Sequence, residues 1–263
     1  MKTILYVFSG TGNSLSVARA LAKDLGNTDV AAIAALPAGT VSTDADRVGI
    51  VFPVYVFGLP MIVAEFCRRL DVKADAYVFG VATCGGMPGA ALRQMQRLLA
   101  ERGRALAFGA VVVMPGNYTP LYGAPSEARQ SKLFAKAAVR LAAIAAAVRE
   151  GKPGRIETSN PLVNWLFSGW MYERSMPHLR EADAKFRWTD RCNRCGVCRQ
   201  VCPVSNIELQ DGHPVWQHRC EQCMACLQWC PQQAIEFGKS TVGRRRYHHP
   251  DFSARDLMLR GIP

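Results

Sequence analysis

The sequence CNRCGVCRQVCP spans residues 192–203, and CEQCMACLQWCP spans residues 220–231. Both stretches space four cysteines by two, two and three residues and end in proline, so the second repeats the first 28 residues later. This spacing is that of bacterial proteins with two iron–sulfur clusters. The pattern therefore predicts an internal duplication that carries two 4Fe-4S clusters and moves single electrons.

Each run predicts three ligands for one cluster and a fourth for the other, because the fourth cysteine follows an intervening turn and points toward the other repeat. Structural zinc also takes sets of four cysteines, and an even cysteine count is also typical of disulfides. Neither requires the doubled run with its proline, so both are disfavoured. The predicted ligand sets are Cys192, Cys195, Cys198 and Cys230 for one cluster, and Cys220, Cys223, Cys226 and Cys202 for the other.

Upstream, from residue 1 to about 150, short β-branched runs alternate with helical patterns. Strands are expected at 4–8, 29–33, 47–52, 77–82 and 108–114, and helices at 14–25, 60–70, 89–101 and 126–149. This order predicts an α/β domain with a doubly wound, five-stranded parallel sheet over residues 1–150. Residues 151–184 are expected to form a helical linker, 185–240 a small α+β domain with the clusters, and 241–263 a basic extension.

The residues SGTGNS, at positions 9–14, follow the first expected strand and open the first expected helix. Backbone N–H groups at a helix N-terminus, together with hydroxyl and amide side chains, suit a phosphate. The loop has no lysine of the Walker type, and Leu15 replaces the third glycine of a dinucleotide fingerprint. We therefore expect a phosphate monoester here, since a purely structural turn would not need four polar side chains.

Two more loops follow expected strands: PVYVFGLP at 53–60 and TCGGMPG at 83–89. Ligands of open α/β sheets bind outside the carboxyl ends of the strands, so the three loops are expected to converge. Within the last loop, Cys84 is either a redox thiol or, as we favour, a small residue that fits beside a ligand. Asn117 and Tyr118, after the fifth strand, could hold a substrate against the same site.

Together, the SGTGNS loop, the 53–60 loop and the duplicated cysteines resemble the flavodoxin/ferredoxin fusion proteins of anaerobes, known as "ferrodoxin" proteins. The resemblance extends to RYHHP at 246–250. It implies a flavodoxin-like domain that binds FMN, followed by a ferredoxin-like domain with two 4Fe-4S clusters. The implied FMN-binding residues are Ser9, Gly10, Thr11, Gly12, Asn13, Ser14, Pro53, Val54, Tyr55, Phe57, Gly58, Thr83, Cys84, Gly85, Gly86, Asn117 and Tyr118.

The formal net charge is +11, whereas flavodoxins are usually acidic. Basic residues are spread over both halves of the chain, which does not favour nucleic-acid binding. Only Arg244, Arg245 and Arg246 form a compact cluster, which could dock an acidic redox partner or be a solvated loop. No membrane span is expected, because Pro53, Gly58 and Pro60 interrupt the one long uncharged stretch. Cysteines kept reduced or bound to metal indicate the cytoplasm.

Residues 161–176 hold a short aromatic segment that is expected to be helical. Packing between domains is its expected role, with a membrane-surface helix or a substrate-facing wall as alternatives.

Two functions fit these features. In the first, the clusters exchange electrons with redox protein partners and pass them to or from FMN. In the second, the chain is an FMN-dependent iron–sulfur reductase of a small molecule. Tyr55, Tyr118 or Cys84 could donate a proton there, but none commits the chain to a substrate. Electron transfer is the favoured interpretation, and whether the chain is an enzyme stays open.

Overall fold

Five parallel strands form the main sheet in the computed structural model, which describes residues 1–258. They are β1 (Thr3–Val7), β2 (Thr28–Ala32), β4 (Arg47–Pro53), β6 (Tyr77–Cys84) and β7 (Leu106–Val113). Their order across the sheet is β2-β1-β4-β6-β7, which is 2-1-3-4-5 when only these strands are counted. That is the flavodoxin-like version of the doubly wound fold, so the predicted fold class is confirmed.

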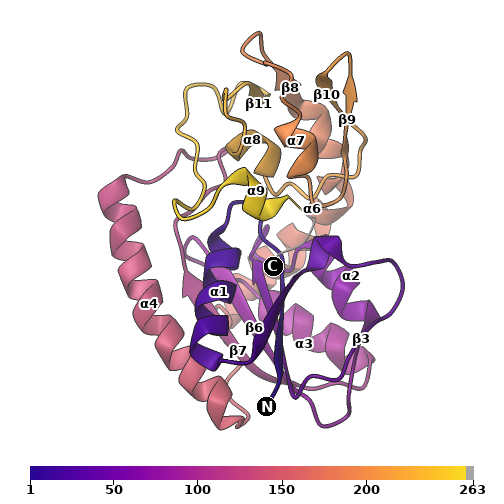
Figure 1. Ribbon diagram of the computed structural model, residues 1–263, viewed down its shortest axis with the longest axis vertical. Coiled ribbons are helices and arrows are strands. Elements are labelled where there is room, and N and C mark those ends of the chain that lie inside the picture. The colour runs from indigo at the N-terminus through magenta and orange to yellow at the C-terminus, as the bar shows by residue number, and fades with distance from the viewer. Residues whose placement is uncertain (259–263) are drawn as a thin grey trace.

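Two helices cover each face of this sheet (Figure 1). On one side lie α1 (Asn13–Leu25) and α4 (Glu127–Glu150), and on the other lie α2 (Met61–Arg69) and α3 (Ala91–Glu101). Helix α1 forms where the sequence places Leu15, Ala18 and Leu21 on one stripe, which is fully buried against the sheet. It ends where the Gly26 N–H donates to the Ala22 carbonyl. Burial of such a side chain stabilises the fold by about 1.5–3 kcal/mol.

The connection from β2 to β4 differs from a regular crossover. Instead of a helix it contains a 3-10 turn, η1 (Ile33–Ala35), and a short strand, β3 (Val41–Thr43). Strand β3 pairs in parallel with β5 (Leu70–Val72) in a separate two-stranded sheet, which the sequence analysis did not predict. Pro37 and Gly39 follow η1 and prevent a longer helix, because proline disfavours the helical conformation in the residue before it.

Residues 186–237 form a second, cysteine-rich lobe. It contains the antiparallel pair β8 (Phe186–Trp188) and β11 (Ile235–Phe237), the hairpin β9 (Ile207–Gln210) and β10 (His213–Trp216), and the short helices α7 (Val197–Gln200) and α8 (Ala225–Gln228). The duplication is visible in the backbone, because positive φ angles recur at the same places of both repeats: at Arg194 and Gln222, and at Gly196 and Met224.

Between the two lobes lies the aromatic segment, which is helical as predicted. It comprises α5 (Pro161–Val163), the π-helix η2 (Asn164–Met171), α6 (Tyr172–Leu179) and the 3-10 turn η3 (Glu181–Lys185). Its inner face holds Ser168, which donates to the Phe57 carbonyl at 2.8 Å, and Tyr172, which donates to the Leu59 carbonyl at 2.7 Å. Its outer face leaves Trp165 and Trp170 more than half exposed. The expected packing role therefore describes only one side of the segment.

Residues 241–258, the C-terminal strap, return from the cysteine-rich lobe to the α/β lobe. They end in α9 (Ala254–Leu257), which starts with a capping box between Ser253 and Asp256. Arg19 of α1 pairs with Asp256 at 3.3 Å. Figure 1 shows α9 between the lobes, next to the carboxyl end of the sheet. The strap therefore ties the two lobes together.

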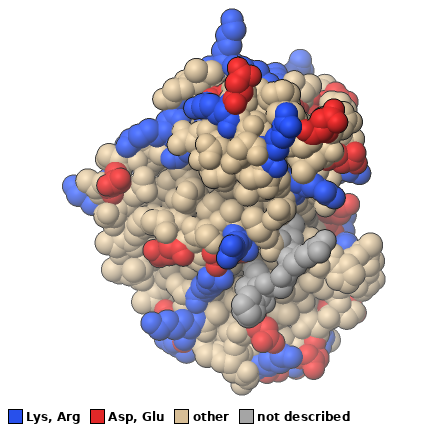
Figure 2. All heavy atoms as spheres, turned by 45° about the horizontal axis from the view of Figure 1, so that its top comes forward, with Lys and Arg blue, Asp and Glu red and all other residues tan. Residues whose placement is uncertain are grey.

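Charged side chains are interspersed over the face shown in Figure 2, where Asp and Glu lie among Lys and Arg. This distribution agrees with the expectation of a solvated, mixed surface. Within residues 1–258, no helix is long and apolar enough to cross a membrane.

Candidate functional site

One set of predicted ligands lines a small cavity in the outer part of the cysteine-rich lobe. Cys192, Cys195, Cys198 and Cys230 all contribute to its wall. Three come from the first repeat and the fourth from the second, because the turn after α8 carries Cys230 across to the first repeat. This arrangement can hold a group with four cysteine ligands, and we call it the outer site.

The second set gathers on the side that faces the α/β lobe. The Cys202, Cys220 and Cys223 sulfurs lie close enough to that of Cys226 for their charges to raise its pKa further. Cys220 and Cys226 are buried, whereas Cys195 of the outer site is exposed. We call this set the inner site.

Burial controls the chemistry of both sites. It raises the pKa of Cys198 and that of Cys220 to about 12, and it also raises the pKa of Cys223 and Cys226 well above the ordinary value. Thiolates in such surroundings need a cation to stay ionised, which iron supplies. Backbone N–H groups also donate to the sulfurs, from Asn206 to Cys202 at 3.2 Å and from Ala234 to Cys230 at 3.3 Å. Such hydrogen bonds tune the reduction potential of a bound cluster.

A buried carboxyl lies beside the inner site. Glu221, between two predicted ligands, is 3% exposed, and its Oε2 atom has no partner within residues 1–258. Burial raises the pKa of Glu221 to about 7. The sequence analysis missed this residue, since nothing in the motif distinguishes it from a surface glutamate.

The phosphate loop, residues 9–14, lies between β1 and α1. Thr11, Asn13 and Ser14 are buried, and within residues 1–258 no acceptor pairs with the N–H groups of these three residues. Ser9 Oγ accepts from the Gly12 N–H at 3.1 Å, and Thr11 Oγ1 accepts from Asn117 Nδ2 at 2.5 Å, so each hydroxyl keeps its proton to donate. Buried, unpaired and uncharged donors at a helix N-terminus fit a phosphate monoester.

The other predicted loops converge only in part. Ser14 Oγ lies 2.8 Å from Thr83 Oγ1, and the Val54 N–H donates to the Thr83 carbonyl at 2.8 Å. Tyr55 packs edge-on against Phe8, whose ring centroid is 5.9 Å away. Gly85 and Gly86 are exposed, and Cys84 is buried beneath them, where burial raises the pKa of its thiol.

Two predicted residues of the 53–60 loop face elsewhere. Phe57 packs against Phe167 of η2 with ring centroids 4.8 Å apart, and Gly58 lies against the Tyr172 ring. The reason is a tight turn, in which Val56 and Phe57 both have positive φ and Tyr55 pairs with Gly58. The structure therefore does not bring Phe57 and Gly58 to the phosphate loop.

Asn117 and Tyr118 connect the phosphate loop with the cysteine-rich lobe. Asn117 bonds to Thr11, as described above, and its carbonyl accepts from Gln228 Nε2 at 2.8 Å. Tyr118 donates to Gln222 Oε1, next to Cys223, at 3.1 Å. Asn117 and Tyr118, expected both to bind FMN and to hold a substrate, thus lie between the phosphate loop and the cysteine-rich lobe, and both roles stay predictions.

The cysteine-rich lobe itself covers the phosphate loop, and the sequence analysis did not predict this. Trp229 Nε1 donates to the Gly10 carbonyl at 2.9 Å. A Cβ atom on Gly10 would lie 2.6 Å from the Cys223 carbonyl oxygen. A ligand of the inner site is thus in direct contact with the phosphate loop. A possible signal was Trp229 itself, because the first repeat has only Val201 at that place.

The C-terminal strap closes the loop from a further side. The His249 N–H donates to the Thr11 carbonyl at 2.8 Å, and Tyr247 Oη donates to Asn13 Oδ1 at 2.5 Å. His249 is buried between Phe134 and Phe252, which lowers its pKa. His249 is thus part of the wall of the site.

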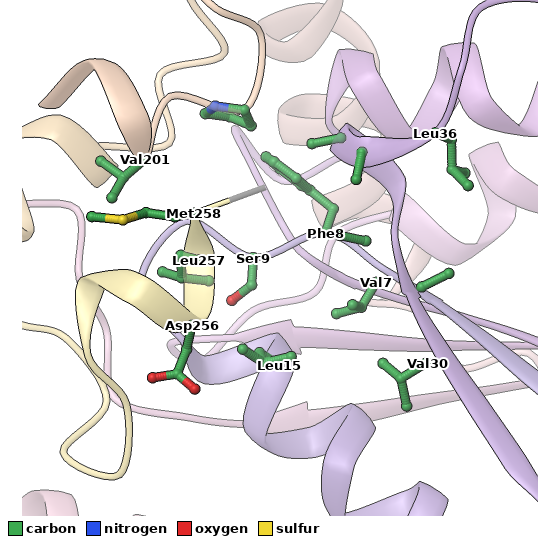
Figure 3. Close-up of a pocket in the computed structure, with 15 residues that line it drawn as sticks. Val7, Phe8, Ser9, Leu15, Val30, Leu36, Val201, Asp256, Leu257 and Met258 are labelled. Carbon is green, nitrogen blue, oxygen red and sulfur yellow. The ribbon is translucent and has the colours of Figure 1, made fainter. Parts of the chain in front are cut away.

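A separate cavity of about 220 Å³ lies beside the same loop (Figure 3). Val7, Phe8 and Leu15 line it from the α/β lobe, and Leu257 and Met258 from the strap. Its wall is mostly apolar and includes Val30, Ala31 and Ala32 of β2, and Ser9 alone of the predicted FMN-binding residues lines it. This cavity therefore does not coincide with the predicted phosphate site.

Comparisons with known proteins agree with the two-lobe architecture. Residues 181–235 match the family model of the 4Fe-4S dicluster domain. A search of curated proteins gives no match to the chain.

Three solved structures illustrate the similarity of the α/β lobe. A putative flavoprotein from Bacteroides uniformis ATCC 8492 is 19% identical, over 43% of this chain and 90% of that one, with a TM-score of 0.36. Fusobacterium nucleatum flavodoxin bound to flavin mononucleotide is 12% identical, over 58% and 99%, with a TM-score of 0.38. Rubredoxin oxygen:oxidoreductase from Desulfovibrio gigas is 16% identical, over 57% and 36%, with a TM-score of 0.37. The fold assignment rests on the strand order rather than on these low scores. The chain joins a lobe with the flavodoxin-like strand order to a lobe that matches the model of the 4Fe-4S dicluster domain.

Proposed function

We propose that this chain carries two 4Fe-4S clusters and FMN, and that it transfers electrons between one-electron partners and the flavin. When bound, the clusters supply one-electron steps and FMN supplies storage for up to two electrons. The observation that carries the proposal is the contact between Cys223 and Gly10, because it joins a ligand of the inner site to the phosphate loop.

The order of the centres follows from burial. Cys195 of the outer site is exposed, whereas Cys220 and Cys226 of the inner site are buried and Cys223 contacts Gly10 of the α/β lobe. Electrons would therefore enter or leave the protein at the outer cluster and pass through the inner cluster to the flavin. The two sets share helices α7 and α8, which contact each other. Exchange of the fourth ligands keeps the two clusters at a fixed separation.

The protein residues around the phosphate loop would bind and enclose the cofactor. The N–H groups of Thr11, Asn13 and Ser14 and the hydroxyls of Ser9 and Thr11 would hold the phosphate. Tyr55, the backbone at 83–86 and Tyr118 would flank the ring. Trp229 and His249 close the loop against water.

The first experiment is cofactor analysis of protein purified without oxygen. We expect about eight irons per chain, from two four-iron clusters, and one acid-released FMN. Zinc in place of iron, or a colourless protein, would end the proposal. Dithionite should then reduce both kinds of centre in the same chain.

A pair of threonine variants tests the phosphate loop. Thr11→Val removes one hydroxyl donor to the phosphate and leaves Asn117 Nδ2 without its acceptor, so FMN affinity should fall by about tenfold to hundredfold. Thr3→Val is the matched control, because Thr3 is also buried but its Oγ1 atom has no partner within residues 1–258. Equal FMN affinity of both variants and the wild type would contradict the assignment.

One observation favours a second candidate, an FMN-dependent reductase of a small molecule. Gly85, Gly86 and Met87 are exposed, so the loop expected to flank the ring is open to solvent. Stopped-flow reoxidation of the reduced protein distinguishes the two functions. Reoxidation by protein carriers alone supports electron transfer, whereas repeated turnover of a small acceptor supports the reductase.

A further inference from the structure

A large groove lies between the cysteine-rich lobe and the C-terminal strap. Its volume is about 810 Å³, and the charged side chains that line it are four arginines and one glutamate: Arg191, Arg244, Arg245, Arg246 and Glu236. We call it the arginine groove. The acidic residue does not offset the basic ones, so the wall is strongly positive.

Two of these arginines keep their full charge for a ligand. Arg244 Nη1 donates to the Thr119 carbonyl at 2.7 Å, and Arg245 Nη2 donates to the Ala124 carbonyl at 2.8 Å. Carbonyl oxygens orient a guanidinium group without neutralising it, and the remaining N–H groups can bind carboxylates in a bidentate manner.

The single carboxylate of the groove is already used. Glu236 is 2% exposed and pairs with Arg246 at 2.7 Å and with Arg191 at 3.2 Å. These ion pairs, together with the Thr241 hydroxyl, lower the pKa of Glu236, so it stays ionised within this network. An acidic ligand in the groove would therefore meet Arg244 and Arg245 without repulsion from a free carboxylate in its wall.

The groove also touches a redox centre. Cys230 and Pro231 line both the groove and the cavity of the outer site. Trp229 stacks on His248, with ring centroids 4.3 Å apart, in the same wall. An occupant of the groove thus lies next to a ligand of the outer cluster.

We infer that the arginine groove docks the acidic face of a one-electron carrier protein and that the outer cluster exchanges an electron with that carrier. The inference rests on the proposed function. In the transfer, the reduced carrier loses one electron and the outer cluster gains one, while no bond breaks and no proton moves. Charge complementarity selects the partner, because acidic side chains of the carrier supply carboxylates that can pair with Arg244 and Arg245.

A hydride donor fits the groove less well. It releases two electrons together, whereas the adjacent cluster accepts one. Nucleic acid is also a weaker match, since basic residues are spread over both halves of the chain rather than concentrated on one element.

The test compares reduction rates by stopped flow, with an acidic ferredoxin as the carrier and photoreduced 5-deazariboflavin as a neutral reductant. Arg244→Gln/Arg245→Gln should lower the rate with the ferredoxin about tenfold at low salt, and the rate should depend less on ionic strength than in the wild type. The rate with the neutral reductant should not change. Arg93→Gln/Arg97→Gln, on helix α3, removes the same charge elsewhere and should retain the wild-type rate.

A conservative variant separates charge from structure. Arg244→Lys/Arg245→Lys keeps both charges and should recover most of the rate with the ferredoxin. Equal losses with both reductants, or equal losses in the α3 control, would overturn the inference. ATP serves as a probe for a site that binds small anions. The inference would also be overturned if calorimetry showed that the wild type binds ATP and that Arg244→Gln/Arg245→Gln does not, while the rate with the ferredoxin stayed unchanged. If the wild type lacks iron or FMN, the proposed function itself fails, and cofactor analysis detects this before any kinetics.

Discussion

The first cysteine repeat, residues 192–203, and the second, residues 220–231, have the same backbone but different surroundings. Arg199 of the first repeat is exposed, whereas Leu227, at the same place in the second, is fully buried. Val201 of the first repeat corresponds to Trp229 of the second, and only Trp229 bonds to the phosphate loop. The spacing of the cysteines thus predicts the ligands, while the residues between them determine which site faces the α/β lobe.

The contrast teaches how a duplicated motif acquires two roles. Both repeats use backbone N–H groups at the same position, Asn206 and Ala234, to bond a cysteine sulfur. Their chemistry is therefore similar. Burial against Gly10 separates the inner site from solvent, and the arginine groove gives the outer site a charged approach.

Replacing one predicted ligand in each repeat should give the largest effect, a loss of iron from the site that contains the replaced cysteine. Cys195→Ser and Cys223→Ser should each lower the iron content from about eight to about four per chain. Only Cys223→Ser should also release FMN, because Cys223 of the inner site contacts Gly10 of the phosphate loop.

Iron analysis and flavin absorbance measure both effects. If Cys195→Ser and Cys223→Ser lost FMN to the same extent, the distinction between inner and outer sites would be wrong.

A methyl group at the contact between Gly10 and Cys223 should weaken the packing of the two lobes. Gly10→Ala places a Cβ atom 2.6 Å from the Cys223 carbonyl oxygen, and overpacking of this kind costs about 1–3 kcal/mol in the free energy of unfolding. Thermal denaturation should show a Tm lower by about 2–10 °C. Gly169→Ala is the control, since its nearest neighbour would be 3.7 Å away. Equal Tm values for the two variants would refute the close contact.

The sequence predicted the elements that depend on local patterns. The strands at Thr3–Val7 and Tyr77–Cys84, and the helix at Glu127–Glu150, lie within a few residues of their expected bounds. The bounds of such elements are encoded locally, by the spacing of apolar residues along the segment and by glycine or proline at its ends. The doubly wound parallel sheet was then predicted from the alternation of strands and helices, whereas the strand order came from the structure.

Contacts between distant segments were beyond the sequence analysis. Trp229 and Gly10 are 219 residues apart, and no local pattern connects them. The surroundings of Phe57 also depend on a distant segment, because the π-helix that packs on it lies about a hundred residues further along the chain, and its role beside FMN stays a prediction. Which side of a loop faces a cofactor is decided by tertiary packing, which composition and spacing do not encode.

Trp229 and Trp188, which both stack on a histidine, should differ by a smaller amount in the free energy of unfolding when each is replaced. Trp229→Phe keeps the ring over His248 but loses the bond to the Gly10 carbonyl, which should cost about 1 kcal/mol. Trp188→Phe, in the outer part, also keeps its stack on His213, where the centroids are 3.8 Å apart, and Trp188 is 40% exposed. Chemical denaturation should show a loss only for Trp229→Phe. A similar loss in both variants would assign the effect to the rings rather than to the bond.

The smallest effect should appear at His249, which lies in the wall of the phosphate loop. Burial lowers the pKa of His249 below its usual 6.5, and its Nδ1 atom accepts from the Asp251 N–H at 3.3 Å, so the folded state favours the neutral ring. As the pH falls, the unfolded chain therefore binds a proton at His249 before the folded chain does. The contribution of the neutral ring to the free energy of unfolding is present above pH 6.5 and is lost as the pH falls from 6.5 through the lowered pKa of the folded state. His249→Asn keeps an acceptor for the Asp251 N–H but cannot titrate. The decrease in Tm from about pH 7.5 to about pH 5.5 should be smaller in this variant than in the wild type. A decrease as large as in the wild type would show that the inner side of the phosphate loop does not respond to protonation of His249.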